Sequence, residues 1–376
     1  MIALALYAAI LAVKALLAWW YARKYPAPRL RTEISPVAVC QAILSGDPDL
    51  QDALESNLAS APQARFVWLI DDDDEEAGRL VTELAGRHCG RDIRILSSPP
   101  PPEGINPKLF KLERARDAVS GGIFLVLDDD TRLGPSSVGA LIDALDRCEL
   151  ATGLPFYRDG GNLFGRLLGQ FVNNNSALTY LPLLPFVRPV SINGMCYALK
   201  TEHLARLGGF DAIMRHLTDD LAVAERVRDA GGRIIQTPFP QEVATTLDSL
   251  PRYMAQMHRW YLFALLLMRR QSAAMNLVIG ALYGAPPLLL AAAIVEVLLH
   301  PSWAALGALA AVLGARALIL CALQWRLSGK VRHRPLLSLL SELLQPLHLA
   351  HAAIVKSIRW RSRRYRVHDN DRFVSI

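Results

Sequence analysis

The segment from Ile2 to Tyr21 constrains this chain most, because it is apolar apart from Lys14 and long enough to cross a bilayer core of ~30 Å. Basic residues follow it directly, at Arg23, Lys24, Arg29 and Arg31. Because positive charge stays on the cytoplasmic side of membranes, residues 1–22 are predicted to be a transmembrane anchor that ends in the cytoplasm. A cleavable signal peptide is the alternative, but it would carry its charge before the apolar core. Lys14 has to snorkel or to meet a partner.

Apolar segments return towards the C-terminal end, where residues 275–299 and 303–325 predict a transmembrane hairpin. Arg316 lies inside the second arm and needs a partner or an interfacial position. Residues 336–358 are apolar but interrupted by polar side chains, and residues 359–376 form a basic tail. If 336–358 crossed the membrane, that tail would lie outside, against the positive-inside tendency. We therefore expect 336–358 to be re-entrant or interfacial and the tail to be cytoplasmic.

Between these segments, residues 33–250 alternate strand-like apolar runs with helical stretches. That alternation predicts an α/β domain with a largely parallel sheet. The expected strands are Val37–Ile43, Phe66–Ile70, Ile93–Leu96, Ile123–Leu127, Ala151–Phe156, Gly194–Leu199 and Arg233–Thr237. The expected helices are Pro48–Leu58, Ala77–Arg87, Pro107–Ala118, Ser136–Asp146, Thr201–Leu207 and Asp219–Asp229. Residues 251–272 then predict an amphipathic helix at the membrane interface.

Hydrophobic residues make up 52% of the chain, and the excess lies at its two ends. The net charge is +6, but the basic residues flank apolar segments, which indicates membrane topology rather than nucleic-acid binding. No basic stripe with interleaved aromatics occurs, so we expect no nucleic acid among the partners. The five cysteines are scattered, without the spacing of a zinc site or a disulfide framework, and they fit a reducing compartment.

Three carboxylates, Asp128, Asp129 and Asp130, follow the apolar run from Ile123 to Leu127. Alternate residues of an extended segment share a face, so we expect Asp128 and Asp130 to point the same way and Asp129 to point away. Ligands of open α/β sheets bind at the carboxyl ends of strands. An oxygen-only site there suits Mg²⁺ or Mn²⁺. The alternative is an acidic loop after a strand.

Three further candidate sites follow the same α/β pattern. The run Asp71–Asp74 comes after a strand and could accept hydrogen bonds from a nucleotide's uracil or ribose, or could be a solvated acidic turn. Asp219 and Asp220 open a helix, where acids also simply favour the helix dipole. Gln256 and Trp260 lie one helical turn apart in a run that could equally be an interfacial helix with a snorkelling arginine.

Taken in chain order, an acidic run, a DxD, a paired aspartate and then QxxRW, the four sites resemble processive or lipid-linked family-2 glycosyltransferases. Finer matches resemble the ceramide glucosyltransferase family, glycosyltransferase family 21. The matching segments are Gly46–Leu50, Asp73–Asp74, Ile105–Lys108, Gly153–Phe156, Asn193–Met195, Leu207–Phe210, Thr218–Asp220, Gln256–Trp260 and Trp360–Arg366. The run Asn173–Leu181 matches no acceptor-region pattern. The resemblance implies a GT-A nucleotide-sugar-binding domain, with one N-terminal transmembrane helix and further C-terminal membrane helices.

The resemblance also implies the donor chemistry, with a UDP-sugar as the substrate. Asp73 would hold the nucleoside, and Asp128 and Asp130 would position a cation, Mg²⁺ or Mn²⁺, on the diphosphate. Lys108 is a second candidate diphosphate cation, with a surface helix lysine as its alternative.

On the acceptor side, the resemblance implies an inverting transfer of a hexose to the hydroxyl of a membrane lipid, ceramide above all. Asp220 would be the general base, and as a carboxylate with a pKa near ~4 it would be a weak base that acts late. Arg259 would stabilise the leaving diphosphate, Trp260 would stack against sugar or acceptor, and Gln256 belongs to the same catalytic set. The catalytic domain would face the cytoplasm, in a bacterial inner membrane or a Golgi-type membrane.

Other functions stay open at this point. The acceptor could be another lipid such as a hopanoid, or a polysaccharide, although the membrane helices are few for a polysaccharide channel. An inactive membrane scaffold of the same fold would have lost one of the four sites, and all four are present. A transporter or receptor does not explain carboxylates at the strand ends of an α/β domain.

Overall fold

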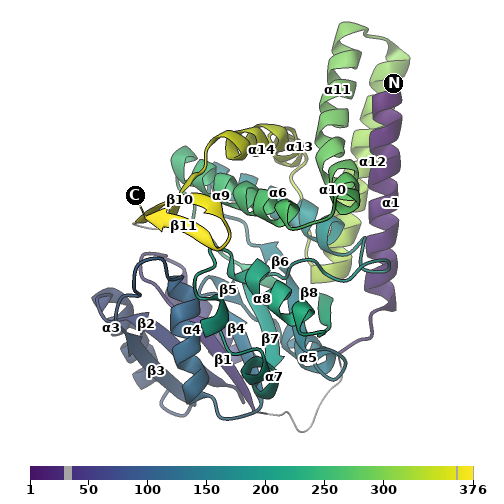
Figure 1. The fold of residues 1–376 in the computed structure, drawn as a ribbon. Helices are drawn as coiled ribbons and strands as arrows, with labels where there is room; N and C mark the ends of the chain where they lie inside the picture. The colour runs from purple at the N-terminus through teal and green to yellow at the C-terminus, as the bar shows by residue number, and fades with distance from the viewer. Residues whose placement is uncertain (29–35, 361–362, 376) are drawn as a thin grey trace. The chain divides into compact units, whose positions relative to one another are not determined.

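A computed structural model describes residues 1–28, 36–360 and 363–375 of the chain (Figure 1). It divides into two compact units. The helical unit contains Met1–Tyr25, Phe156–Val187 and Leu247–Ile358, and the α/β unit contains Pro26–Pro155, Arg188–Thr246 and Arg359–Ile376. Of the basic residues that support the predicted topology, Arg29, Arg31 and Arg361 lie outside the described residues.

In the described part of the chain, an eight-stranded sheet of order β3-β2-β1-β4-β7-β6-β8-β5 forms the α/β unit. Its strands are β1 (Val37–Ala42), β2 (Arg65–Asp71), β3 (Ile93–Ser98), β4 (Ile123–Leu127), β5 (Thr131–Arg132), β6 (Leu150–Tyr157), β7 (Cys196–Lys200) and β8 (Ile234–Val243). Its helices are α2 (Leu50–Ser60), α3 (Glu75–Arg87), α4 (Pro107–Ala118), α5 (Pro135–Ala144), α7 (Thr201–Arg206) and α8 (Asp219–Asp229), with a 3₁₀ turn at Asp211–Ile213.

The parallel pairing is confined to one half of this sheet. Strands β3, β2, β1 and β4 pair in parallel, whereas β7 runs antiparallel to both β4 and β6. A parallel connection needs a crossover that packs back on the sheet. Between β6 and β7 the chain runs instead through α6 (Leu163–Tyr180), which belongs to the helical unit. The expectation of a largely parallel sheet is therefore corrected for this half.

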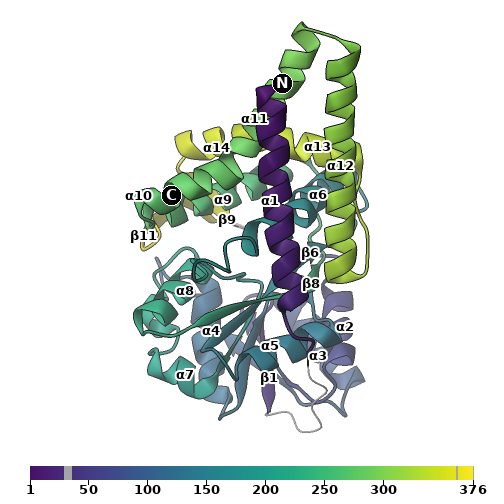
Figure 2. The same cartoon turned by 90° about the vertical axis from the view of Figure 1, so that its right-hand side faces the viewer.

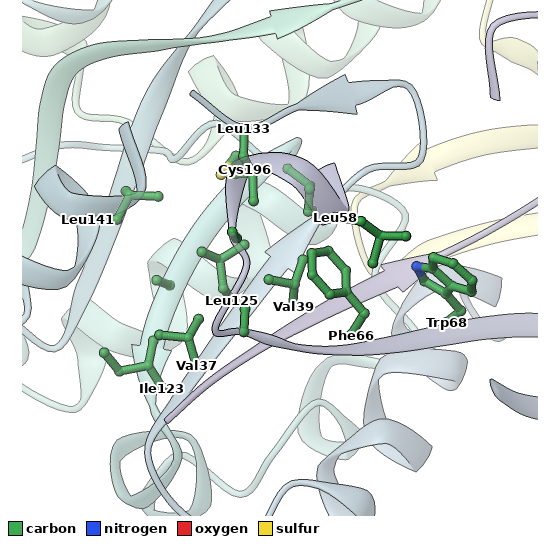
Figure 3. Close-up of a cluster of buried hydrophobic side chains, with 14 of the residues drawn as sticks. Val37, Val39, Leu58, Phe66, Trp68, Ile123, Leu125, Leu133, Leu141 and Cys196 are labelled. Carbon is green, nitrogen blue, oxygen red and sulfur yellow. The ribbon is translucent and has the colours of Figure 1, made fainter. Parts of the chain in front are cut away.

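Both faces of the parallel strands are buried. Val37, Phe66 and Leu125 contribute to one cluster with Leu58 of α2 and Leu141 of α5 (Figure 3). The alternate residues of the same strands pack on the opposite face, against Leu109 and Leu112 of α4 and their neighbours. Strands buried on both faces read as continuous apolar runs, which is why the sequence predicted their positions well. Each fully buried apolar side chain contributes ~1.5–3 kcal/mol to the free energy of folding, relative to an exposed one.

Within the described residues, three helical segments of the helical unit are long and apolar enough to cross a membrane: Ile2–Lys24, Ala273–Leu299 and Trp303–Ser328. They comprise α1 (Ile2–Lys24), then α10 (Ala273–Ile279), a π turn (Gly280–Gly284) and α11 (Ala285–Leu299), and finally α12 (Trp303–Ser328). Helix α1 lies alongside α11 and α12 (Figure 1 and Figure 2). The anchor and the hairpin expected from the sequence are therefore present as helices.

The two cations inside these apolar helices both have partners. Lys14 donates to the carbonyl of Leu282 (3.0 Å) in the π turn, and its Nζ lies 4.6 Å from the centre of the Tyr283 ring. Arg316 of α12 pairs with Glu342 (2.7 Å) and donates to the Ser338 hydroxyl (2.8 Å). A π turn leaves carbonyls outside the regular helical ladder, which makes one available to the lysine.

The remaining helices are α9 (Leu250–Arg269), α13 (Pro335–Leu343) and α14 (Gln345–Ile354). Leu344 separates α13 from α14, which have 9 and 10 residues. At 1.5 Å per residue each is only about 15 Å long, roughly half a bilayer core. Neither could span alone, so this region keeps its prediction of a re-entrant or interfacial segment.

The C-terminal residues, expected only as a basic tail, form strands. In the described part of the chain, β9 (Ser357–Trp360), β10 (Arg363–Asp369) and β11 (Arg372–Ser375) make a three-stranded sheet, with β10 and β11 antiparallel. Tyr365 and Val367 are buried on one side of this hairpin, and the Tyr365 ring packs edge-on against Phe373. The high density of arginine hid this alternation in the sequence.

The ion pair of Arg316 and Glu342 gives a stability prediction. Arg316→Met leaves the largely buried Glu342 carboxylate without its guanidinium partner and with only the Tyr7 hydroxyl as a donor, so we expect a loss of up to about 3–5 kcal/mol in the free energy of unfolding. The double variant Arg316→Met/Glu342→Leu removes both charges and should recover most of that loss. Thermal unfolding in detergent measures both, with Leu318→Ala, an exposed position on the same helix, as the control. Equal stability of the single and double variants would contradict this prediction.

Candidate active site

Carboxylates gather where the parallel strands of the α/β unit end. The carboxyl ends of β1, β2 and β4 lie side by side, because these strands are parallel neighbours in the sheet. Asp71 closes β2, and Asp128 directly follows β4. The open edge at the carboxyl ends of strands is where α/β sheets bind ligands, so this edge is the candidate site.

Asp128, Asp129 and Asp130 lie in a turn rather than in an extended strand. Strand β4 ends at Leu127, and the Thr131 amide donates to the Asp128 carbonyl (3.1 Å). The argument that alternate residues share a face therefore does not apply here and is corrected. The Asp129 carboxylate accepts a hydrogen bond from the Leu44 amide (2.9 Å), next to the end of β1. The Asp129 carboxylate is thus hydrogen-bonded to the backbone, whereas the Asp128 carboxylate pairs with Lys108.

Asp130 is the most perturbed of the three carboxylates. It accepts hydrogen bonds from the hydroxyls of Thr245 (2.8 Å) and Thr131 (3.1 Å). Burial, and then the charges of Asp128 and Asp129, raise the pKa of Asp130 to about 7. Such clustering of negative charge is expected at a site that is built to receive a cation.

These residues fit a divalent cation only in combination with a ligand. Among the described residues, no group of three or more His, Cys, Asp or Glu side chains is arranged to hold a metal ion. Two neighbouring carboxylates are nevertheless a usual protein contribution to Mg²⁺ or Mn²⁺ sites, in which phosphate oxygens and water complete the coordination. Asp128 and Asp130 are the candidate pair.

Lys108 connects two parts of this edge. Its Nζ lies 2.7 Å from Asp128 Oδ1 and 2.8 Å from Asp219 Oδ2, and it donates to the Gly194 carbonyl (2.8 Å). Burial alone would lower its pKa, but Asp128 and then Asp219 raise the pKa of Lys108 well above its usual value. The side chain is only 16% exposed and is charged, so Lys108 is not a surface lysine.

The start of α4 fixes Lys108 in this position. The Asn106 side chain caps the helix by accepting from the amides of Lys108 (3.0 Å) and Leu109 (3.3 Å), and Pro107 occupies the first turn. An asparagine cap followed by proline is a strong helix start. One turn later, Lys111 donates to the carboxylate of Asp71 (3.1 Å). One helix therefore supplies lysines to two strand ends.

Asp219 and Asp220 occupy the first turn of α8. Asp219 pairs with Lys108, and Asp220 accepts a hydrogen bond from the Leu221 amide (2.8 Å). Burial, followed by the charge of Asp219, raises the pKa of Asp220 to about 7. At that pKa the Asp220 carboxylate is a better proton acceptor at neutral pH than the weak base expected from the sequence.

Gly194 permits the close packing of Asp220. A Cβ placed on Gly194 would lie 3.1 Å from the Cβ of Asp220 and 3.7 Å from the Asp219 carboxylate. A contact of 3.1 Å is shorter than ordinary van der Waals separation, so a side chain there would have to push Asp220 aside. This explains why a glycine stands within the Asn193–Met195 segment.

The acidic run after β2 divides into structural and exposed residues. Asp71 pairs with Lys111, and Asp74 caps α3 by accepting from the Ala77 amide (3.0 Å). Burial raises the pKa of Asp74, but hydrogen bonds from the Ser45 and Ala77 amides outweigh it and hold that pKa below its usual value. Asp73 is exposed in the connecting turn, where its carboxylate can meet a ligand.

Gln256, Arg259 and Trp260 lie on α9, which belongs to the helical unit. Arg259 donates to the Gln256 side chain (2.9 Å), which orients the guanidinium. The Trp260 ring stacks on Phe171 (ring centres 6.0 Å apart) and meets Tyr157 edge-on (6.1 Å). His258 contacts the Ser357 carbonyl (2.9 Å), in keeping with a packing role.

The family model described as Glycosyl transferase family 21 matches residues 1–373. Among solved structures, a mannosyltransferase from Pyrobaculum calidifontis in complex with GDP-Man and Mn²⁺ is 18% identical, with 94% of this chain and 97% of that chain covered and a TM-score of 0.54. At that identity the likeness shows the fold, which is GT-A-like.

A second solved structure is more distant. Glucosyl-3-phosphoglycerate synthase from Mycobacterium tuberculosis, in complex with Mn²⁺, uridine diphosphate and phosphoglyceric acid, is 18% identical over 57% of this chain and 72% of that chain, with a TM-score of 0.36. No curated protein sequence matches this chain.

The packing of Gly194 against Asp220 gives a prediction for the site. Gly194→Ala should push Asp220 aside by a few tenths of an ångström and lower the turnover rate by roughly three- to tenfold, since a misplacement of about 1 Å would lower it about 10²-fold. Gly86→Ala on α3 is the control, since a Cβ at Gly86 meets nothing within 4 Å. Steady-state kinetics of both variants check this, and full activity of Gly194→Ala would show that the contact is unimportant.

Proposed function

We propose that this chain, which belongs to glycosyl transferase family 21, moves a hexose from a UDP-sugar to the hydroxyl of a membrane lipid, with inversion at the anomeric carbon. The observation that carries the proposal is the chain of ion pairs from Asp128 through Lys108 to Asp219, beside Asp220. It joins a candidate donor site to a candidate proton acceptor within one edge of one sheet. A ceramide-like acceptor is favoured by the family resemblance of the sequence.

For the donor, Asp128 and Asp130 are proposed to hold Mg²⁺ or Mn²⁺ and Lys108 to bind the diphosphate. A cation bound there would neutralise charge that develops on the leaving diphosphate. Lys108 carries a permanent charge at this edge and can exchange a carboxylate partner for a phosphate oxygen. Asp73, exposed after β2, is proposed to accept hydrogen bonds from the nucleoside.

For the acceptor, Asp220 is the proposed general base. It takes the proton of the lipid hydroxyl while the hydroxyl oxygen forms a bond to C1 of the sugar. The bond from C1 to the diphosphate breaks on the opposite face, and the electron pair leaves with the nucleotide. The pKa of Asp220, raised to about 7, supports this role, because a base works best when its pKa lies near the working pH.

Gln256, Arg259 and Trp260 are proposed as further catalytic residues on the strength of the sequence resemblance. The hydrogen bond from Arg259 to Gln256 orients the guanidinium, as a role in binding the leaving diphosphate requires. The Trp260 side chain already stacks on Phe171, so any stacking on sugar or acceptor would use the rest of its surface.

The membrane is the proposed source of the acceptor. The long apolar helices of the helical unit support an integral membrane protein. Basic residues flank the apolar segments, and this supports a catalytic domain on the cytoplasmic side. A bacterial inner membrane or a Golgi-type membrane would provide that arrangement, and α9 would lie at the interface, where a lipid hydroxyl is accessible.

The proposed reaction is tested with purified protein, a panel of UDP-sugars and extracted lipids, followed by mass spectrometry. We expect one lipid class, most of all a ceramide, to gain the mass of a hexose. A sugar polymer, or a product that forms only from non-lipid acceptors, would contradict the proposal.

The role of Asp220 is tested by Asp220→Asn, which keeps the size of the side chain but removes its basicity. Turnover should fall by about 10²–10⁴-fold. In the unchanged protein, kcat/KM should rise by about tenfold per pH unit towards a plateau above pH ~7, because only the deprotonated carboxylate accepts a proton. Asp229→Asn, at the exposed other end of α8, is the control. A flat pH profile together with full activity of Asp220→Asn would exclude this base.

The metal requirement is tested by chelation. Removing divalent cations with EDTA should abolish transfer, and adding Mg²⁺ or Mn²⁺ should restore it. Asp128→Asn should raise the cation concentration needed for half-maximal rate, since one carboxylate ligand loses its charge. Asp117→Asn, on the exposed side of α4, should leave that concentration unchanged. Undiminished activity in EDTA would remove Asp128 and Asp130 from the metal site.

A further inference from the structure

The two residues that precede Asp219 are held by the C-terminal hairpin. Within the α/β unit, the Thr218 amide and the Thr218 hydroxyl both donate to Asn370 Oδ1, each at 2.7 Å. The Leu217 amide donates to the Asn370 carbonyl, also at 2.7 Å. Asn370 lies in the turn between β10 and β11. Three hydrogen bonds to one residue therefore fix the chain directly before Asp219 and Asp220.

The Thr218 side chain makes a hydrogen bond that is unusual for its position at the start of α8. It is the N-cap residue of α8, where a threonine hydroxyl normally accepts a hydrogen bond from an amide of the first turn. In the described structure its side chain makes no such capping bond, and the hydroxyl donates to Asn370 instead. The start of α8 is thus positioned from outside the helix.

Burial makes these contacts hard to replace. Asn370 and Thr218 are each only 1% exposed. Without the Asn370 side chain, the Thr218 amide and hydroxyl would lose their acceptor where water has little access. The chain before α8 would then relax, and the first-turn carboxylates would move with it.

A second asparagine, at the start of α4, also binds this segment. Asn106, the cap of α4, donates through Nδ2 to the carbonyls of His216 (3.0 Å) and Leu217 (3.3 Å). The same side chain caps the helix that carries Lys108. Hydrogen bonds from the α4 cap and from the hairpin turn therefore hold residues 216–218. The next residue, Asp219, pairs with Lys108 of the same helix α4.

We propose that Asn370 is a positioning residue for Asp220, and that the C-terminal hairpin supports the active site. The proposal rests on the role of Asp220 in the proposed function. Asn370 acts through Thr218, so it should affect the placement of the base far more than donor binding, which we assign to Asp73, Lys108, Asp128 and Asp130. If Asp219 moves, Lys108 still keeps its ion pair with Asp128 and the Asn106 cap of its helix.

A nested set of variants tests this. Thr218→Ser keeps both donors and should retain turnover within about twofold. Thr218→Val loses the hydrogen bond of the hydroxyl and should lower kcat by about three- to tenfold. Asn370→Ala loses the side-chain acceptor of both the Thr218 amide and the Thr218 hydroxyl and should lower kcat by about tenfold or more. KM for the nucleotide sugar should stay within about twofold in all three. The double variant Thr218→Val/Asn370→Ala should be no worse than Asn370→Ala alone, because both act through the same contact.

A readout independent of activity completes the test. Hydrogen exchange of the peptide over residues 212–224 should become faster in Asn370→Ala, while the peptides of β1, β2 and β4 keep their protection. Val374→Thr, at an exposed position on β11, should change neither kinetics nor exchange. If no sugar donor is ever transferred, the exchange result still decides whether Asn370 holds this segment.

The proposal is overturned by any of three results. The first is wild-type kcat in Asn370→Ala. The second is unchanged exchange over 212–224. The third is a rise in exchange across the whole α/β unit together with a rise in donor KM, which would mean that Asn370 serves general stability.

Discussion

The ion pairs of Lys108 are the interaction on which the rest of the α/β unit depends. One ammonium group lies within 2.8 Å of two carboxylates that come from different elements, the turn after β4 and the start of α8. Buried carboxylates repel one another unless a cation lies between them. Lys108 therefore allows the partly buried carboxylates of Asp128 and Asp219 to lie close together at the same edge, and its own position follows from the Asn106 cap.

The sequence predicted the parallel half of the sheet well, because strands buried on both faces are runs of apolar residues. It was less reliable where a side chain's direction depends on a turn. Asp128 and Asp130 were expected to share a strand face, yet the strand ends before both of them. The acidic run after β2 also could not be resolved, since only the capping geometry shows that Asp74 is structural and Asp73 exposed.

Long-range polar contacts were not predictable, because periodicity and motif spacing report only local structure. The Asn173 side chain binds the backbone amide (2.7 Å) and carbonyl (2.9 Å) of Tyr157, and Asn174 donates to Ser338 (2.7 Å). These contacts give the asparagine run a structural role in the helical unit. For Arg316 the sequence indicated only the need for a partner, and the structure identifies Glu342. A polar residue in an apolar segment must have a partner, but the sequence does not show which residue provides it.

The hairpin turn at Asn370 has a consequence for how the protein is made. Thr218 and Asn370 are 152 residues apart, and every long apolar helix after the α/β strands lies between them in the chain. Since synthesis runs from the N-terminus, the segment before α8 leaves the ribosome long before its partner does. The two long apolar segments Ala273–Leu299 and Trp303–Ser328 are therefore synthesised before residues 216–218 can gain their contacts with Asn370. A partly synthesised chain would therefore have the carboxylates that follow β4, while the start of α8 would still lack its contact with Asn370.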